Sequence, residues 1–242
     1  RRVLFRSWYV DYSKEEVKAF PEGAITIKAT TTTNCGSDSA TLQLIKPQKQ
    51  NPGSLLYVGI SASTGMSTAI QTAGALVING KPAVIDKKYI FGSVTPVGDE
   101  YYRLTEDLQG QRGAIWALQT VDPKKFSASF SYIIGGASAA DGFAFIFSRE
   151  PFLASDGGGL GYQDGNPASI AVEVDIYYNE EFDPDNSHVA VLSGGSVRTH
   201  HALVSLPVRP AGTIGVNYEN GILDVYFSKV KIISLPIGIP GL

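Results

Sequence analysis

The chain has 242 residues, of which 43% are hydrophobic and 18% are charged, and its formal net charge at pH 7 is -3. This length suits one all-β sandwich or two small domains, and the lack of any Lys/Arg cluster removes the electrostatic footprint expected for nucleic acid or an anionic membrane. No segment approaches the roughly 18 consecutive apolar residues of a membrane span, and the single Cys35 cannot form an intrachain disulfide.

The first predicted element is a short helix within an N-terminal tail, residues 1–22. Ser13 with Glu16 three residues later matches a capping box, and Pro21 ends a helix that would cover residues 11–20. The first ten residues carry positive charge, but Arg6 interrupts the apolar run that a signal peptide needs, which favours an internal or processed start. We expect one sandwich domain to follow, over residues 23–242.

Short runs rich in Val, Ile, Thr, Tyr and Phe, separated by Gly, Pro, Asn and Ser, fill the rest of the chain. The segment N-C-G-S-D predicts a hairpin between two of them. The tail S-L-P-I-G-I-P-G-L argues against a further strand inside a sheet, because proline cannot donate a ladder hydrogen bond. About fourteen short strands with tight turns predict an all-β, two-sheet jelly-roll sandwich. The predicted strands are 24–33, 40–46, 55–61, 75–78, 89–91, 101–104, 113–118, 126–134, 142–148, 170–176, 189–192, 202–206, 213–218 and 223–227.

One of these strands has an apolar face and an acidic face. Side chains alternate along a strand, so every second residue of 170–176 points the same way. Two neighbouring carboxylates on one face raise each other's pKa unless a cation or hydrogen-bond donors compensate them. The apolar face is predicted to consist of Ile170, Val172, Val174 and Ile176. The other face is predicted to consist of Ala171, Glu173, Asp175 and Tyr177.

Further metal-binding side chains follow this strand: Asn179, Asp183 and His188, with Pro184 fixing a turn. Oxygen ligands suit calcium, whereas a mixed carboxylate and imidazole set suits a transition metal such as manganese. The alternative interpretation is an acidic surface loop that closes a hairpin. The position of the acids inside an apolar strand, rather than beyond its end, favours the metal site.

Several motifs then point to one family. They are L-Q-G-Q-R-G-A-I-W from Leu108, F-S-A-S-F-S-Y-I-I from Phe126, A-D-G-F-A-F-I-F from Ala140, G-G-G-L-G-Y from Gly157 and V-E-V-D-I-Y-Y-N-E-E-F-D-P from Val172. In order and spacing they resemble the L-type (legume) lectin domain. The resemblance implies a concanavalin-like jelly roll that binds glycans without catalysis. It also implies an extracellular or cell-surface location, and a homo-oligomer formed through the back sheet.

One motif stands at an unusual place. The family's last strands carry a motif like Y-V-G-F-S-A-S-T-G, which here occurs as Y-V-G-I-S-A-S-T-G from Tyr57 to Gly65. A circular permutation would explain this, with residues 23–80 supplying the strands and loop usually found at the family's C-terminus; nearby surface termini make such rearrangement tolerable. Alternatively, residues 1–80 finish a preceding repeat, and the end of the next repeat lies elsewhere or on a neighbouring chain.

The resemblance implies two metals side by side. The transition-metal ligands, for Mn²⁺ or a similar ion, would be Glu173, Asp175, Asp183 and His188. The Ca²⁺ ligands would be Asp175, the backbone carbonyl of Tyr177, Asn179 and Asp183. The two shared aspartates can both stay ionised because the positive charge of the bound cations favours the ionised form of each carboxyl. The resemblance also implies a cis peptide between Ala140 and Asp141.

The sugar site implied by the resemblance lies above the calcium. A carboxylate and an amide would pair with sugar hydroxyls, glycine would let a backbone N–H approach, and a ring would stack on the sugar's apolar face. These residues would be Asp141, Gly158 or Gly159, Asn179, Tyr177, and Met66 with Ser67. His200 and His201 have no matching role and are predicted to be surface or sheet-edge histidines, while Trp116 is predicted to lie in the core.

Two other functions remain open from the residues. Jelly-roll glycoside hydrolases acting on β-glucans carry E-x-D-x-x-E, whose two glutamates serve as nucleophile and acid/base. Here the sequence after Glu173 and Asp175 has Tyr178 in place of the second glutamate. The third function is a structural or adhesive surface module that has kept the fold and lost sugar affinity.

Overall fold

The computed structural model describes residues 25–33, 36–44, 55–136, 139–180, 183, 187–196, 200–208 and 210–239. The chain divides into two compact units, Arg1–Gln50 and Asn51–Leu242, and each is described by itself. The helix predicted over residues 11–20 lies outside the described residues. Among the residues that are described, no helix is long and apolar enough to cross a membrane.

The first unit contains the predicted hairpin strands. β1 (Ile25–Thr33) and β2 (Gly36–Leu44) pair antiparallel from Ile25 opposite Leu44 to Thr33 opposite Gly36. Threonine and isoleucine favour this extended conformation because their branched side chains pack well on a pleated surface. Within the described residues these two strands form a sheet of their own. The assignment of residues 23–242 to one sandwich domain stays a prediction.

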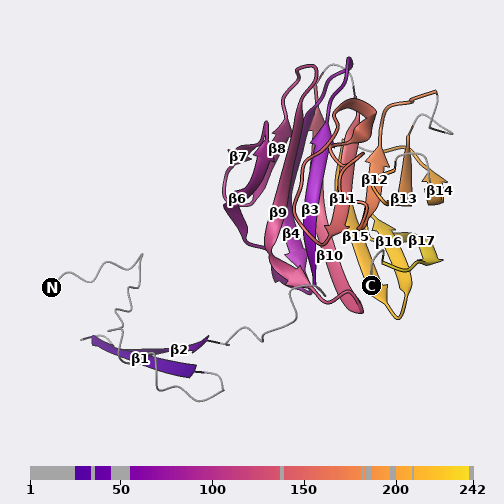
Figure 1. The fold of residues 1–242 in the computed structure, drawn as a ribbon. Helices are drawn as coiled ribbons and strands as arrows, with labels where there is room; N and C mark the ends of the chain where they lie inside the picture. The colour runs from indigo at the N-terminus through magenta and orange to yellow at the C-terminus, as the bar shows by residue number, and fades with distance from the viewer. Residues whose placement is uncertain are drawn as a thin grey trace. The chain divides into compact units, whose positions relative to one another are not determined.

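The second unit is a sandwich of two antiparallel sheets, seen as two stacked layers in Figure 1. The seven-stranded sheet has, in spatial order, β14 (His200–Ser205), β13 (His188–Ser193), β12 (Ser169–Asp175), β11 (Gly142–Ser148), β3 (Leu56–Ser63), β9 (Arg112–Val121) and β6 (Ile85–Gly92). The eight-stranded sheet has β17 (Val230–Pro236), β16 (Ile222–Phe227), β15 (Ala211–Glu219), β10 (Lys125–Gly135), β4 (Ile70–Ile78), β8 (Tyr101–Thr105) and β7 (Thr95–Val97), with β5 (Lys81–Pro82) beside β4. The predicted all-β, two-sheet jelly roll is confirmed.

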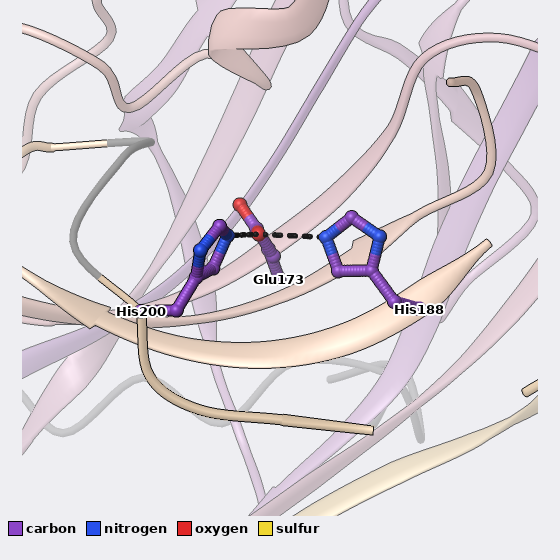
Figure 2. Close-up of side chains that lie close together, drawn as sticks. All are labelled: Glu173, His188 and His200. Atoms are coloured by element: carbon purple, nitrogen blue, oxygen red, sulfur yellow. Dashed lines mark hydrogen bonds and ion pairs between the residues drawn. The ribbon is translucent and has the colours of Figure 1, made fainter. Parts of the chain in front are cut away.

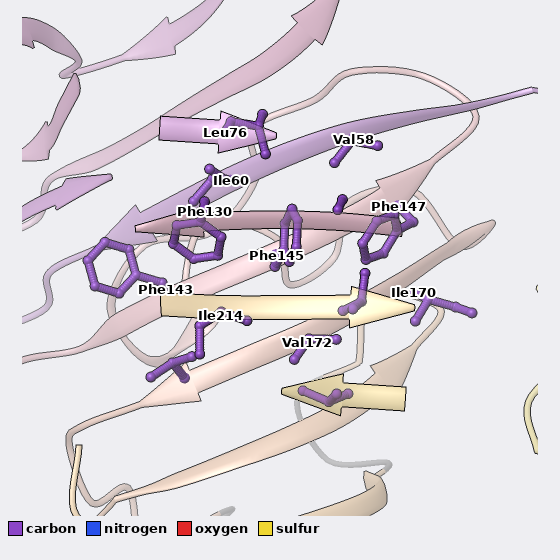
Figure 3. Packing of buried hydrophobic residues seen from close by; sticks show 14 of the residues in the cluster. Val58, Ile60, Leu76, Phe130, Phe143, Phe145, Phe147, Ile170, Val172 and Ile214 are labelled. Carbon is purple, nitrogen blue, oxygen red and sulfur yellow. The ribbon is translucent and has the colours of Figure 1, made fainter. Parts of the chain in front are cut away.

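The core lies between the two sheets and is built from alternate residues of each strand. On β11, Phe143, Phe145 and Phe147 all point inward and are fully buried. Phe145 meets Phe130 of β10 edge-on, with ring centroids 5.0 Å apart, and Figure 3 shows this packing. Such aromatic pairs stabilise the interior beyond the apolar area that they bury. The two sheets are therefore held together by one continuous aromatic and aliphatic layer.

The alternation predicted for the acidic strand is present in β12. Ile170, Val172 and Val174 belong to the core between the sheets, whereas Glu173 and Asp175 point to the outer face of the seven-stranded sheet. That outer face is also covered, because Leu160 and Tyr162 pack with buried residues of three strands, β9, β11 and β12, in a second apolar cluster. The carboxylates of β12 are therefore buried although they lie outside the sandwich core. The members of this outer cluster are Ala114, Trp116, Ala144, Ile146, Leu160, Tyr162 and Ala171.

Trp116 is fully buried in the outer cluster, which confirms its predicted core position. Its indole Nε1 donates a hydrogen bond to the Phe152 carbonyl at 2.9 Å. Gly59 on neighbouring β3 leaves room for the ring, since a Cβ there would lie 2.3 Å from a Trp116 ring atom. The indole thus fixes residue 152 and the segment after it over the sheet.

Several strand predictions need correction, including the omission of β5 and β7 and the start of β6 at Ile85 rather than at residue 89; two corrections have a clear structural reason. The tail was expected to carry no further strand, but β17 extends to Pro236, which pairs with Ile222. Pro236 is tolerated because β17 is an edge strand and the proline is its last residue. β4 begins at Ile70 rather than at residue 75, because Gly74 lets the β8 backbone approach: a Cβ would lie 2.3 Å from the Glu100 carbonyl.

The displaced motif lies in the middle of the seven-stranded sheet. β3, which carries most of it, pairs with β11 on one side and β9 on the other. The loop after β3 then begins at Thr64 and Gly65, next to the start of β11. The chain order that a circular permutation would explain stays a prediction, but the motif itself is part of the sandwich.

Candidate functional site

Glu173 lies at the centre of a buried polar cluster on the outer face of the seven-stranded sheet. The Tyr162 hydroxyl donates a 2.8 Å hydrogen bond to Glu173 Oε2, and His188 Nε2 lies 3.2 Å from Oε1 (Figure 2). Burial raises the pKa of Glu173, but His188, His200 and the Tyr162 hydroxyl beside the carboxylate outweigh burial and hold the pKa below its ordinary value. Glu173 is thus an ionised carboxylate in a nearly water-free site.

Asp175 ends β12 and lies opposite His188 of β13 in the sheet register. Its Oδ1 accepts a 2.8 Å hydrogen bond from the Tyr177 backbone N–H. Burial, followed by the charges of Glu173 and Asp183, nevertheless raises the pKa of Asp175 to about 9. The side chain therefore needs a cation beside it to be ionised at neutral pH.

Asp183 is held against the loop that follows β12. The Asn179 backbone N–H donates to Asp183 Oδ2 at 2.6 Å, and the Asp183 N–H donates to the Asn179 carbonyl at 2.9 Å. Burial also raises the pKa of Asp183, although the Asn179 hydrogen bond opposes the shift. This paired contact positions Asp183 near the end of β12, as the predicted ligand set requires.

The donor atoms of these side chains fit a divalent cation. One atom each of Asp175, Asp183 and His188 lie within 4.8 Å of one another, and so do single atoms of Glu173, His188 and His200. In the part of the chain that the structure describes, buried His188 Nδ1 has no hydrogen-bond partner. Carboxylate oxygens are ligands that calcium prefers, and a mixed set of carboxylates and imidazole suits first-row transition metals. Three of the four predicted transition-metal ligands, Asp175, Asp183 and His188, thus lie in one group, and Glu173 lies with His188 in the other.

Asp141 lies beside this cluster at the start of β11. The Ala140–Asp141 peptide is cis, as predicted. The Asp141 N–H donates to the Ser63 carbonyl, and the Asp141 carbonyl accepts from the Ile176 N–H, both at 3.0 Å. Burial raises the pKa of the carboxyl to about 6 against the lowering effect of the Gly65 N–H. Asp141 therefore ties the loop after β3 to the loop after β12.

The glycine-rich segment forms a short 3-10 helix, η2 (Gly157–Gly159), next to these loops. Ser63 Oγ donates to the Gly157 carbonyl at 2.6 Å. A Cβ on Gly158 would lie 2.7 Å from Asn179 Oδ1, so glycine is what lets Asn179 approach. Gly159 instead faces Ser155 and Gln163. Of the two glycines predicted for the sugar site, the structure brings Gly158 against Asn179.

The remaining predicted sugar contacts lie on exposed positions around this point. Met66 is 88% exposed and Tyr177 is 39% exposed, while Ser67 is half-buried. The Met66 carbonyl accepts a 2.8 Å hydrogen bond from Gln109 Nε2, which anchors the loop after β3. Gly65 lies directly against Asp141: a Cβ on Gly65 would come within 3.4 Å of Asp141 Oδ2. Residues from four separate loops therefore converge at one end of the seven-stranded sheet.

Two residues of the polar cluster were not assigned a role by sequence reasoning. Tyr162 occurs in the G-G-G-L-G-Y motif, but only its hydrogen bond to Glu173 reveals its part in the cluster. His200 lies on edge strand β14, as the sheet-edge prediction has it, yet its Nε2 is 3.4 Å from Glu173 Oε1. No linear spacing indicates this contact, because it depends on a register shift between β13 and β14.

The raised carboxyl pKa values predict how the metal-free protein responds to pH. Asp175, with its pKa raised to about 9 from 3.8, and Asp141, raised to about 6, keep protons in the folded state that the unfolded chain releases. The contribution of these two carboxyls to stability is therefore fully present below their ordinary pKa of 3.8 and is lost as the pH rises through about 6 and then about 9. Urea unfolding of chelator-treated protein at pH 5, 7 and 8.5 should show this fall. Equal stability at the three values would contradict these pKa shifts.

Comparison with known proteins gives a consistent picture. Residues 102–233 match the model of the legume lectin domain, which is more than half of the chain. The chain is 32% identical over 129 residues to 2-acetamido-2-deoxy-D-galactose-binding seed lectin 2 of Cytisus scoparius, covering 48% of this chain and 45% of that protein. It is 32% identical over 88 residues to favin of Vicia faba, covering 32% and 38% of the two chains. The chain spans less than half the length of these relatives.

Proposed function

This chain belongs to the legume lectin family, and from that premise we propose that it is a non-catalytic, calcium-dependent protein that binds mono- or oligosaccharides. The observation that carries the proposal is the convergence of Asp141, Gly158 and Asn179 beside a buried carboxylate and imidazole cluster. Acceptor-only carboxylates, amides and exposed backbone suit sugar hydroxyls. We further propose an extracellular or cell-surface location, and self-association through the eight-stranded sheet.

In this proposal the metal ligands are those of the predicted set. Asp175 and Asp183 would bridge two ions, with Glu173 and His188 completing the transition-metal side. The Tyr177 carbonyl and the Asn179 side chain would complete the calcium side. Bound cations would supply the positive charge that keeps these buried carboxylates ionised. The support comes from burial and donor geometry: Asp175 is buried, and its pKa is raised to about 9.

The sugar would contact residues on three of the converging loops. The Asp141 carboxylate and the Asn179 amide would accept and donate hydrogen bonds, and Gly158 would offer its backbone. Tyr177 would present its ring to the apolar face of the sugar, and Met66 with Ser67 would border the site. The Cytisus relative is named for binding 2-acetamido-2-deoxy-D-galactose, so galactosamine derivatives are the first sugars to test.

The proposal that the site is non-catalytic rests on the neighbours of Glu173. Retaining glycosidases need two carboxyl groups about 5–5.5 Å apart on either side of the scissile bond. Here both carboxylate oxygens of Glu173 are in contact with neighbouring side chains, Oε2 with Tyr162 and Oε1 with His188. Exposed Tyr178 stands where the second glutamate of the hydrolase motif would be. We therefore expect no hydrolysis of β-glucans.

A glycan array read with calcium, with chelator, and after calcium is restored tests the function. We expect binding to be present, then lost, then recovered. We also expect calcium to raise the melting temperature, because a ligand that binds only the folded state stabilises it by mass action. Array binding that persists in chelator, or that never appears with calcium present, would refute the lectin function.

A further inference from the structure

Glu173 Oε1 faces two imidazoles rather than one. His188 Nε2 lies 3.2 Å away and His200 Nε2 lies 3.4 Å away, and Figure 2 shows both rings directed at the same carboxylate. The three donor atoms lie within 4.8 Å of one another. His200 Nε2 is itself buried and makes no hydrogen bond of good geometry within the described residues. A third donor is therefore aimed at the point where Glu173 and His188 meet.

A β-bulge brings His200 to this position. β14 is the outer strand beside β13, and its register shifts so that His200 lies opposite Leu192 and His201 is the extra residue. Cross-strand partners share a face, and so do alternate residues of β13. His200 therefore lies on the face of His188, which is also the face that carries Glu173.

Tyr162 holds one oxygen of the Glu173 carboxylate, which leaves the other oxygen for the two imidazoles. Tyr162 donates to Oε2 at 2.8 Å, so Oε1 is the atom that both histidines approach. Hydrogen bonds of this kind orient a metal-binding carboxylate and tune its basicity. Glu173 and His188 are buried, while the His200 side chain keeps 18% of its surface exposed. That exposure gives the site an opening on the β14 side.

We propose that His200 is an additional ligand of the transition-metal site. Two imidazoles and Glu173 then give this site a preference for zinc, copper or nickel over manganese. The inference rests on the proposed function, because it concerns the metal side of that site. Imidazole suits zinc, copper and nickel, whereas carboxylate and water suit manganese. The added nitrogen raises zinc affinity and changes manganese affinity little.

The alternative role for His200 is that of a counter-ion. A protonated imidazole beside Glu173 would balance the buried charge without binding metal. Such a role predicts that His200 contributes equally to the stability of the folded protein with and without zinc. The two roles are separated by metal selectivity, because only a ligand changes zinc affinity relative to manganese affinity.

The test compares the wild-type chain with the variants His200→Ala and His201→Ala. His201 is the matched control, because it is an adjacent histidine of the same strand whose Nε2 contacts Ser193 Oγ at 2.7 Å instead of Glu173. Zinc and manganese affinities are measured in calcium-saturated protein by competition with a chromophoric chelator. We expect His200→Ala to lower zinc affinity at least about tenfold, as loss of a metal-site partner does, with manganese affinity and the His201→Ala variant unchanged.

A wild-type measurement makes the result independent of any variant. Long-range ¹H–¹⁵N spectra of the histidine rings should show one nitrogen of His188 and one of His200 shifting when zinc is added. Equal zinc affinity in wild type and His200→Ala, or a shift confined to His188, would overturn the role of His200. Failure of the wild-type chain to bind either metal would instead overturn the metal centre of the proposed function.

Discussion

Asp175→Asn should abolish metal-dependent sugar binding while leaving the fold intact. Asparagine resembles the protonated aspartate that burial favours in the metal-free protein, and its side-chain oxygen can still accept the Tyr177 N–H bond. It lacks the negative charge that both proposed cations share. Removing one charge of a buried pair costs about 3–5 kcal/mol, so metal affinity should fall on the order of 150- to 5000-fold.

Calcium titration followed by melting temperature and by isothermal calorimetry measures this effect. The matched control is Glu180→Gln, which removes one carboxylate charge from an exposed position of the same loop and should leave metal affinity unchanged. The metal-free melting temperature of Asp175→Asn should lie within a few degrees of wild type. A calcium-dependent stabilisation of wild-type size in Asp175→Asn would rule out the proposed bridging role.

Gly158→Ala should weaken sugar binding about 5- to 150-fold with little loss of stability. The new methyl group would lie 2.7 Å from Asn179 Oδ1, and Asn179 must turn away. The clash falls on the end of a side chain rather than on backbone, so the fold can absorb it. Loss of the amide partner of one sugar hydroxyl lowers the binding free energy by about 1–3 kcal/mol, which corresponds to the stated loss in affinity.

The control for this variant is Gly238→Ala, since an added Cβ at Gly238 meets nothing within 4 Å. Sugar affinity is compared by calorimetry at saturating calcium, and stability by urea unfolding. If Gly158→Ala binds sugar as tightly as wild type, Gly158 and Asn179 lie outside the sugar site. If stability falls by more than about 2 kcal/mol, the segment serves the fold more than the ligand.

Local patterns were sufficient for much of the sandwich. The alternation of β12 predicted its two faces, because a period of two is imposed by the strand itself, and Val172 and Val174 lie in the core as expected. The burial of Glu173 and Asp175 is different, since it depends on Leu160 and Tyr162 folding over the outer face. No residue of β12 carries that information.

Features that depend on neighbouring strands were predicted less well. Proline near the end of β17 argues against a strand inside a sheet, but it is compatible with the edge position that β17 occupies. The approach of His200 to Glu173 depends on a bulge in β14, which no short motif signals. The choice of Gly158 over Gly159 depends on the turn of η2. In each case a contact distant in the sequence decides the outcome.

The hydrogen bond from Ser63 to Gly157 joins residues 94 positions apart, and it has a consequence for the order of folding. A loop of that length must close before the bond can form, and closure of distant contacts slows folding. The contact between β3 and η2 can therefore form only after these two distant segments have been brought together. The end of the seven-stranded sheet that holds the proposed sugar site is thus expected to form among the last steps of folding.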